Sequence, residues 1–108
     1  MWVSIDLGGT NLQVGLFSGE LELLYAISRP LEGREYEYVL EEMERGVEQM
    51  RVFIQKEGLS GSIVGGGIGA PGWCDHGVLR SAANFSSWRD CAICVDLEAR
   101  VNMPVFNL

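Results

Sequence analysis

The residues best suited to chemistry lie in one short segment, Asp6-Leu7-Gly8-Gly9-Thr10-Asn11. Its two glycines allow a tight turn that brings backbone N–H groups close to an anion. Thr10 adds a hydroxyl donor, and Asp6 can hold Mg²⁺ directly or through water. This combination indicates binding of a magnesium nucleotide. A plain hairpin turn, with Gly-Gly selected for its backbone dihedral angles, is equally compatible with the same residues.

A second glycine-rich segment, Gly67-Ile68-Gly69-Ala70-Pro71-Gly72, matches the pattern G-x-G-x-x-G. A dinucleotide-binding turn must open a helix at this point. Trp73 and turn-forming residues follow instead, so that class of site is excluded. The segment predicts a strand end whose backbone amides and carbonyls face a ligand. The alternative is a bulged strand that enters a tight turn.

Two further polar side chains need assignment. Asn84 offers both a donor and an acceptor, which suits a sugar hydroxyl, although a turn-forming role explains it as well. His76 follows Asp75 in an expected turn, and no nucleophile can be assigned to it, so it is interpreted as a surface histidine. Trp88 is predicted to be a core anchor.

The chain has three cysteines, Cys74, Cys91 and Cys94. An odd, low number argues against a secreted disulfide framework. Cys91 and Cys94 form a lone C-x-x-C, and their spacing to Cys74 and His76 matches no familiar zinc module. They are interpreted as ordinary thiols rather than as a redox or metal site.

Hydrophobic periodicity predicts the elements that must position these groups. Alternation of apolar and polar residues predicts three strands joined by short turns. Apolar residues at helical spacing follow, and Gly46 lies near their apolar face, where it would permit close packing on a sheet. Gly58 and Asn102 are predicted to be left-handed residues that end helices. The expected order is βββαβαβ in an α/β fold with a mixed sheet of about five strands. The expected ranges are strands 3–7, 12–17, 21–27, 63–69 and 104–108, helices 36–54 and 94–101, and a loop 71–90 with a hairpin at 75–77.

Composition excludes several classes of protein. The 108 residues suit one domain, and the net charge of −7 argues against nucleic-acid binding. No apolar run approaches the roughly 20 residues that span a bilayer. The first residues lack the positive region of a signal peptide, so a cytoplasmic location is expected.

Together these segments resemble the N-terminal domain of the ROK family of sugar kinases and regulators. The resemblance spans nearly the whole chain and implies a ribonuclease-H-like domain of the actin-like ATPase type. It also implies that residues 1–108 form the first of two lobes. The matching stretches are Ile5 to Asn11, Gly67 to Gly72, Ala82-Ala83-Asn84-Phe85 with Trp88, and Pro104-Val105-Phe106.

The resemblance also implies roles for particular residues. ATP and Mg²⁺ are the implied cofactors, with Asp6 on the metal and Gly8, Gly9, Thr10 and Asn11 at the ATP phosphates. The implied sugar contacts are Ala70, Pro71, Gly72 and Asn84. The catalytic base of the family would fall just beyond Leu108, so no catalytic residue is assigned in this chain. Residues 1–108 alone are therefore expected to be inactive.

The expected activity of the complete protein is ATP-dependent phosphorylation of a hexose or an N-acetylhexosamine. One alternative is a sugar-responsive ROK transcriptional regulator, which carries a helix-turn-helix before this domain. Met1 lies only five residues before Asp6, which favours the kinase. A second alternative is a non-catalytic assembly module, which would not need an intact loop from Asp6 to Thr10. Apolar surface that a second lobe would cover predicts that this chain can form a homodimer.

Overall fold

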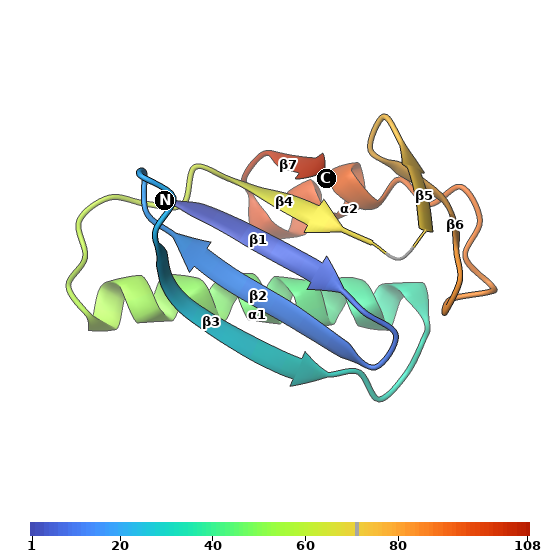
Figure 1. The fold of residues 1–108 in the computed structure, drawn as a ribbon, viewed down its shortest axis with the longest axis horizontal. Coiled ribbons are helices and arrows are strands. Elements are labelled where there is room, and N and C mark those ends of the chain that lie inside the picture. Colours follow the sequence, from blue (N-terminus) through green and yellow to red (C-terminus); the bar gives the residue numbers. More distant parts are fainter. Residues whose placement is uncertain (71) are drawn as a thin grey trace.

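The computed structural model describes residues 1–70 and 72–108. Within them, the strands form a five-stranded mixed sheet in the order β3-β2-β1-β4-β7 and a separate two-stranded hairpin, β5-β6 (Figure 1). This confirms the predicted α/β class and element order, with the hairpin inserted after β4. The elements are β1 (Trp2–Leu7), β2 (Asn11–Phe17), β3 (Leu23–Pro30), α1 (Tyr36–Lys56), β4 (Gly65–Gly69), β5 (Gly72–Asp75), β6 (Val78–Ala82), α2 (Ile93–Val101) and β7 (Val105–Asn107).

The sheet combines two kinds of pairing. β1 pairs antiparallel with β2, and β2 pairs antiparallel with β3. β4 runs parallel to β1, and β7 runs parallel to β4. The carboxyl ends of β1, β4 and β7 therefore meet at one edge of the sheet, which is where ligands bind in open α/β sheets. Asp6 and Gly69 lie at that edge, in register with each other.

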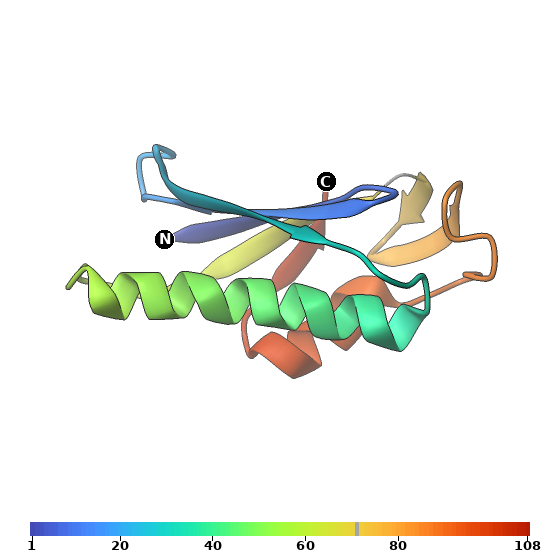
Figure 2. The same ribbon diagram turned by 90° about the horizontal axis from the view of Figure 1, so that it is seen from below.

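Both helices pack on one face of the sheet (Figure 2). The alternation seen in the first two strands arises because every second side chain faces α1. In the part of the chain that the structure describes, no helix is long and apolar enough to cross a membrane. The side chains buried between sheet and α1 include Val3, Ile5, Leu7, Leu12, Val14 and Leu16 from the strands, and Val39, Leu40, Met43, Val47 and Met50 from the helix.

At Gly46, α1 packs tightly against the sheet. A Cβ atom built on it would lie 2.7 Å from Cγ2 of Val14, which is buried. No real Cβ atom sits so near another carbon, so any side chain would push the helix away from β2. This confirms the predicted reason for a glycine in the middle of a helix.

We expect Gly46→Ala to lower the free energy of unfolding by about 1 kcal/mol. Overpacking a core costs about 1–3 kcal/mol, whereas alanine gains about 1 kcal/mol in helix propensity. Val14 is β-branched and cannot turn its methyl group aside cheaply. The coupling between the two residues is measured by urea unfolding of wild type, Gly46→Ala, Val14→Ala and the double variant. The double variant should lose less than the sum of the single losses, and a Gly46→Ala chain more stable than wild type would refute the close contact.

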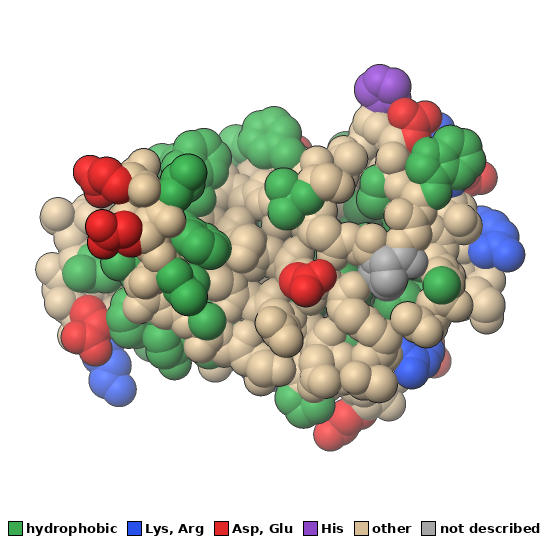
Figure 3. Space-filling view, viewed as in Figure 1, with side chains coloured by type: hydrophobic (Ala, Val, Ile, Leu, Met, Phe, Trp, Pro, Cys, Tyr) green, Lys and Arg blue, Asp and Glu red, His purple; other side chains and the backbone are tan. Residues whose placement is uncertain are grey.

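The second face of the sheet is open. Figure 3 shows hydrophobic side chains gathered over the end of the sheet where β1 begins and beside β7. Trp2, Phe106 and Leu108 are exposed there, and with Phe17 they line a hollow of about 400 Å³. An apolar surface of this kind is typical of a surface that another chain or domain covers. Formation of a homodimer through it remains a prediction.

The structure differs from the sequence expectations in three places. Leu21 was expected to begin the third strand, but it has φ +65° in a turn closed by bonds between Ser18 and Glu22, and β3 begins at Leu23. The fourth strand begins at Gly65 rather than residue 63, since its pairing starts opposite Trp2. Part of the expected loop 71–90 forms β5 and β6, whose strands extend the predicted hairpin at 75–77 on both sides.

Other local predictions are confirmed. Gly58 and Asn102 have φ values of +65° and +61°, so both adopt the left-handed conformation at helix ends. His76 lies at the hairpin turn, with its side chain 94% exposed and 2.7 Å from the Asp75 carboxylate. It is a surface histidine.

Candidate functional site

The turn between β1 and β2 holds the predicted phosphate loop. The Gly8 N–H donates to the Asn11 carbonyl at 3.0 Å, which closes the turn. The Thr10 carbonyl accepts from the Leu31 N–H at 2.9 Å, so the loop is tied to the segment after β3. The Thr10 side chain is exposed, and its hydroxyl accepts from Nδ2 of Asn11 at 3.2 Å. The hydroxyl proton therefore stays available to a ligand.

Asp6 lies at the carboxyl end of β1, on the open face of the sheet. Its side chain is exposed, and Oδ1 lies 3.7 Å from where a Cβ on Gly69 would be, which is an ordinary van der Waals contact. Among the described residues, no basic group forms an ion pair with it. The carboxylate oxygens are therefore open to a cation.

The residues present fit Mg²⁺ better than zinc. Mg²⁺ is bound in proteins through one or two carboxylates and keeps several waters or phosphate oxygens. Asp6 offers one such carboxylate at the sheet edge. Within residues 1–70 and 72–108, no three His, Cys, Asp or Glu side chains gather into a metal-binding group. A magnesium ion on Asp6 would therefore take most of its ligands from water and from the nucleotide.

Asn84 lies directly against the phosphate loop. A Cβ built on Gly9 would lie 2.8 Å from Nδ2 of Asn84 and 2.9 Å from its Cγ. Only a glycine can therefore occupy position 9 while Asn84 keeps its place. The structure thus brings together a predicted phosphate-binding residue and a predicted sugar-binding residue from segments 75 positions apart.

Aromatic packing holds the segment that carries Asn84. Phe85 and Trp88 are buried and stack with ring centroids 4.2 Å apart, and Tyr36 meets Trp88 edge-on at 5.2 Å. The indole N–H of Trp88 donates to the Arg34 carbonyl at 2.8 Å. Trp88 is a core anchor, as predicted, and with Phe85 it fixes the chain that follows the exposed Asn84.

The predicted Ala70-Pro71-Gly72 contact surface is described in part. Pro71 lies outside the described residues. Ala70 is partly buried against the core, and its carbonyl accepts from the Gly72 N–H at 2.9 Å. Gly72 pairs with Ala82 in the hairpin, two residues before Asn84, so this segment shares one corner with it. A Cβ on Gly72 would meet the Ser81 carbonyl oxygen at 1.9 Å, which gives this glycine a structural reason of its own.

Arg34, in the connection between β3 and α1, was not identified from the sequence. Its guanidinium donates to the Gly9 carbonyl, and its Cζ lies 5.6 Å from the centroid of the Phe85 ring. No sequence pattern marked it, because a single arginine in a polar connection is unremarkable. It adds the only cation among the described residues that hydrogen-bonds to the backbone of the loop from Gly8 to Asn11.

The cysteines lie apart from this site's chemistry. Cys94 is buried, and Cys74 and Cys91 are partly buried. Burial raises the pKa of Cys94 to about 11 and raises the pKa values of Cys74 and Cys91 as well. All three thiols therefore stay protonated at neutral pH, which is unsuited to nucleophilic chemistry.

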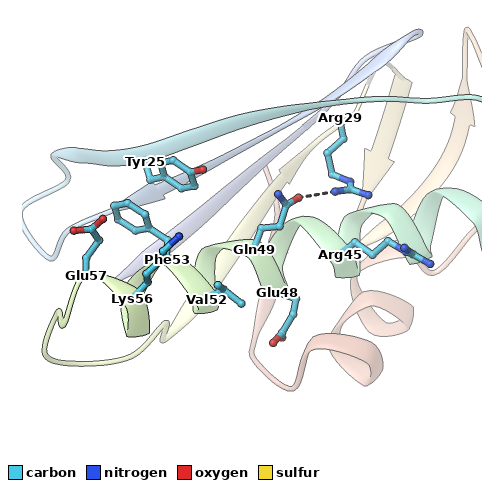
Figure 4. Close-up of a pocket in the computed structure, with 9 residues that line it drawn as sticks. All are labelled: Tyr25, Arg29, Arg45, Glu48, Gln49, Val52, Phe53, Lys56 and Glu57. Carbon is cyan, nitrogen blue, oxygen red and sulfur yellow. Dashed lines mark hydrogen bonds between the residues drawn. The ribbon is translucent and has the colours of Figure 1, made fainter.

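A hollow larger than the one on the open face of the sheet lies between β3 and α1. It measures about 570 Å³, and Tyr25 stacks on Phe53 there with centroids 4.2 Å apart (Figure 4). Its arginines are engaged: Arg29 bonds Gln49 at 2.5 Å and pairs with Glu42, and Arg45 pairs with Glu41 on α1. Because the predicted site residues do not line it, we place the candidate site at the sheet edge and not in this groove.

The fold recurs in solved structures of sugar kinases. An inorganic polyphosphate/ATP-glucomannokinase from Arthrobacter sp. strain KM is 27% identical, with a TM-score of 0.83 over 99% of this chain and 43% of that one. A ROK hexokinase from Thermus thermophilus is 30% identical, with a TM-score of 0.74 over 98% of this chain and 34% of that one. A ROK transcriptional regulator homologous to the Escherichia coli MLC protein, at 18% identity and a TM-score of 0.80, shows the shared fold alone.

These comparisons define the fold and the extent of the match. With its βββαβαβ order, the chain has the ribonuclease-H-like fold of the actin-like ATPases. It spans less than half the length of the two kinases. No curated protein sequence matches it. The ROK family pattern, however, matches residues 2–107, nearly the whole sequence. The chain belongs to the ROK family.

Proposed function

We propose that the complete protein is an ATP-dependent sugar kinase that phosphorylates a hexose or an N-acetylhexosamine, and that residues 1–108 are its N-terminal lobe. The observation that carries the proposal is the contact between Gly9 and Asn84. Direct phosphoryl transfer requires the phosphate site and the sugar site to adjoin. Further support comes from the two kinases described above, which share this fold at 27% and 30% identity.

In the proposed reaction, residues of this chain bind and orient the nucleotide and the sugar. They do not supply the catalytic base. The Gly9 amide and the Thr10 hydroxyl bind phosphate oxygens, and Gly8 closes the turn that presents them. Asp6 would hold Mg²⁺, which would neutralise part of the phosphate charge. The Ala70–Gly72 segment and Asn84 orient the sugar hydroxyl. The proposed base follows β7, whose carboxyl end lies on the same sheet edge as those of β1 and β4.

A coupled assay of ADP release tests the proposal. It uses the gene product read to its natural stop codon, Mg-ATP, and a panel of hexoses and N-acetylhexosamines. We expect ADP release that depends on one sugar class. Inorganic polyphosphate serves as a second donor in parallel, because the Arthrobacter enzyme is named for both donors. Folded protein that binds a sugar but releases no product with either donor would contradict the proposal and favour a sugar-responsive regulator. If it also bound no sugar, an assembly module would be favoured.

A further inference from the structure

Arg34 joins three segments of the candidate site that are distant in sequence. Its guanidinium donates to the carbonyl of Gly9 in the phosphate loop. The same group lies over Phe85, the residue after Asn84, at 5.6 Å from the ring centroid. Its own carbonyl accepts from the Trp88 indole at 2.8 Å, which fixes the backbone that carries it. The side chain is therefore anchored at both ends, although it is exposed to solvent.

No carboxylate among the described residues neutralises the charge of Arg34. The chain has a net charge of −7 and only eight Lys and Arg residues. Five of the described arginines form ion pairs with carboxylates: Arg29, Arg45, Arg51, Arg80 and Arg100. Arg34 forms none with the residues that the structure describes, although acidic side chains outnumber basic ones. A positive charge at the loop is therefore maintained in an acidic protein.

The hydrogen bonding of Arg34 leaves donors for a ligand. A guanidinium has five N–H groups in a planar fork, and among the described residues a single protein acceptor is bonded, the Gly9 carbonyl. Holding that carbonyl alone would need only a neutral donor such as glutamine. An arginine held rigidly on an aromatic ring is suited to binding a planar array of anionic oxygens, because little side-chain entropy remains to be lost.

We infer that Arg34 is a positioning residue for the phosphoryl group: it fixes the Gly9 carbonyl and directs its remaining N–H groups and its charge toward the phosphate that the loop binds. This inference rests on the proposed function, since it takes the loop to be the phosphate site. Its ligand class is the phosphate chain of a magnesium nucleotide. Arg34 is not expected to bind the neutral hydroxyl groups of the sugar.

Two substitutions in the full-length protein separate charge from tethering. Arg34→Gln keeps a donor for the Gly9 carbonyl and removes the charge, whereas Arg34→Lys keeps the charge and removes the fork. We expect Arg34→Gln to weaken binding of Mg-AMPPNP, measured by calorimetry, about 10-fold, as loss of a charge-assisted hydrogen bond does. Arg34→Lys should recover part of that loss. The KM for ATP should rise in parallel, while the KM for the sugar changes less than about threefold.

Arg45→Ala is the control, because it removes an exposed arginine that pairs with Glu41 on the outer surface of α1. Melting temperatures of all variants identify any loss of fold. Binding by Arg34→Gln equal to that of Arg45→Ala would overturn the inference while leaving the kinase proposal intact. Equal losses in Arg34→Gln and Arg34→Lys, together with lowered melting temperatures, would make Arg34 a purely structural clip and also overturn it. Wild type that neither binds Mg-AMPPNP nor releases ADP would refute the proposed function itself.

Discussion

Asp6→Asn in the full-length protein is expected to lower kcat/KM for Mg-ATP by at least about 100-fold. A bound metal contributes several kcal/mol of charge stabilisation to phosphoryl transfer, and every 1.4 kcal/mol is tenfold in rate. Asparagine keeps the size of the side chain but loses the negative charge that holds Mg²⁺. Steady-state kinetics over a range of Mg²⁺ concentrations measure the effect. Raised Mg²⁺ should restore part of the activity if the metal is held through water.

The stability of the Asp6→Asn variant should hardly change. Asp6 is exposed, and within the described residues it forms no ion pair, so its free energy of unfolding should stay within about 0.5 kcal/mol of wild type. Glu20→Gln is the matched control, since it removes one exposed carboxylate in the turn at the opposite end of β2. Activity of Asp6→Asn within about threefold of this control would reduce Asp6 to a turn residue.

The sheet and its first helix could be predicted because their burial is regular. Every second residue of β1 and β2 faces α1, and hydrophobic alternation reports a covered face directly. The same reasoning was wrong at Leu21, which continues the alternation of β3 although it lies in a turn and is 70% exposed. β3 is an edge strand and most of its residues are exposed, so alternation there follows no buried face.

The hairpin β5–β6 was predicted at residues 75–77, but the extent of its two strands was not. Its strands are short, and they bulge between Trp73 and Cys74, so neither shows a two-residue period. Its position also depends on contacts from distant segments. The Gly77 N–H donates to Oδ1 of Asn107 at 2.9 Å, and the Gly77 carbonyl accepts from the Cys94 N–H at 3.2 Å. No local pattern encodes these contacts.

The candidate site could likewise be predicted only in part. The loop from Asp6 to Thr10 follows from residue types within five positions, so a single sequence can indicate it. The meeting of Gly9 with Asn84 depends on the burial of Phe85 and Trp88. The sequence predicts a core position for Trp88, but it does not place that residue beside a given turn. Arg34 is a stronger example, because its role exists only once the loop and the ring of Phe85 are side by side.

Gly9→Ala is expected to raise the KM for the sugar between about 10- and 100-fold while leaving the protein folded. The new methyl group would lie within 2.9 Å of the Asn84 side chain, which must move. Asn84 is exposed and its amide is the end of a flexible side chain, so the move costs little stability. Gly9 is also absent from the described glycines with positive φ, so alanine brings no backbone strain. The loss is that of about two hydrogen bonds to sugar hydroxyls, each contributing about 0.5–1.5 kcal/mol.

A double-variant cycle decides whether that loss acts through Asn84. If Gly9→Ala works by displacing the Asn84 amide, then Gly9→Ala/Asn84→Ala should have a sugar KM no higher than Asn84→Ala alone. Gly19→Ala is the control for a turn glycine, because a Cβ there meets nothing within 4 Å. If the double variant raised the KM for the sugar by the product of the two single effects, Gly9 and Asn84 would act independently. The contact between them would then be a matter of packing, and the adjoining of phosphate and sugar sites would lose its main support.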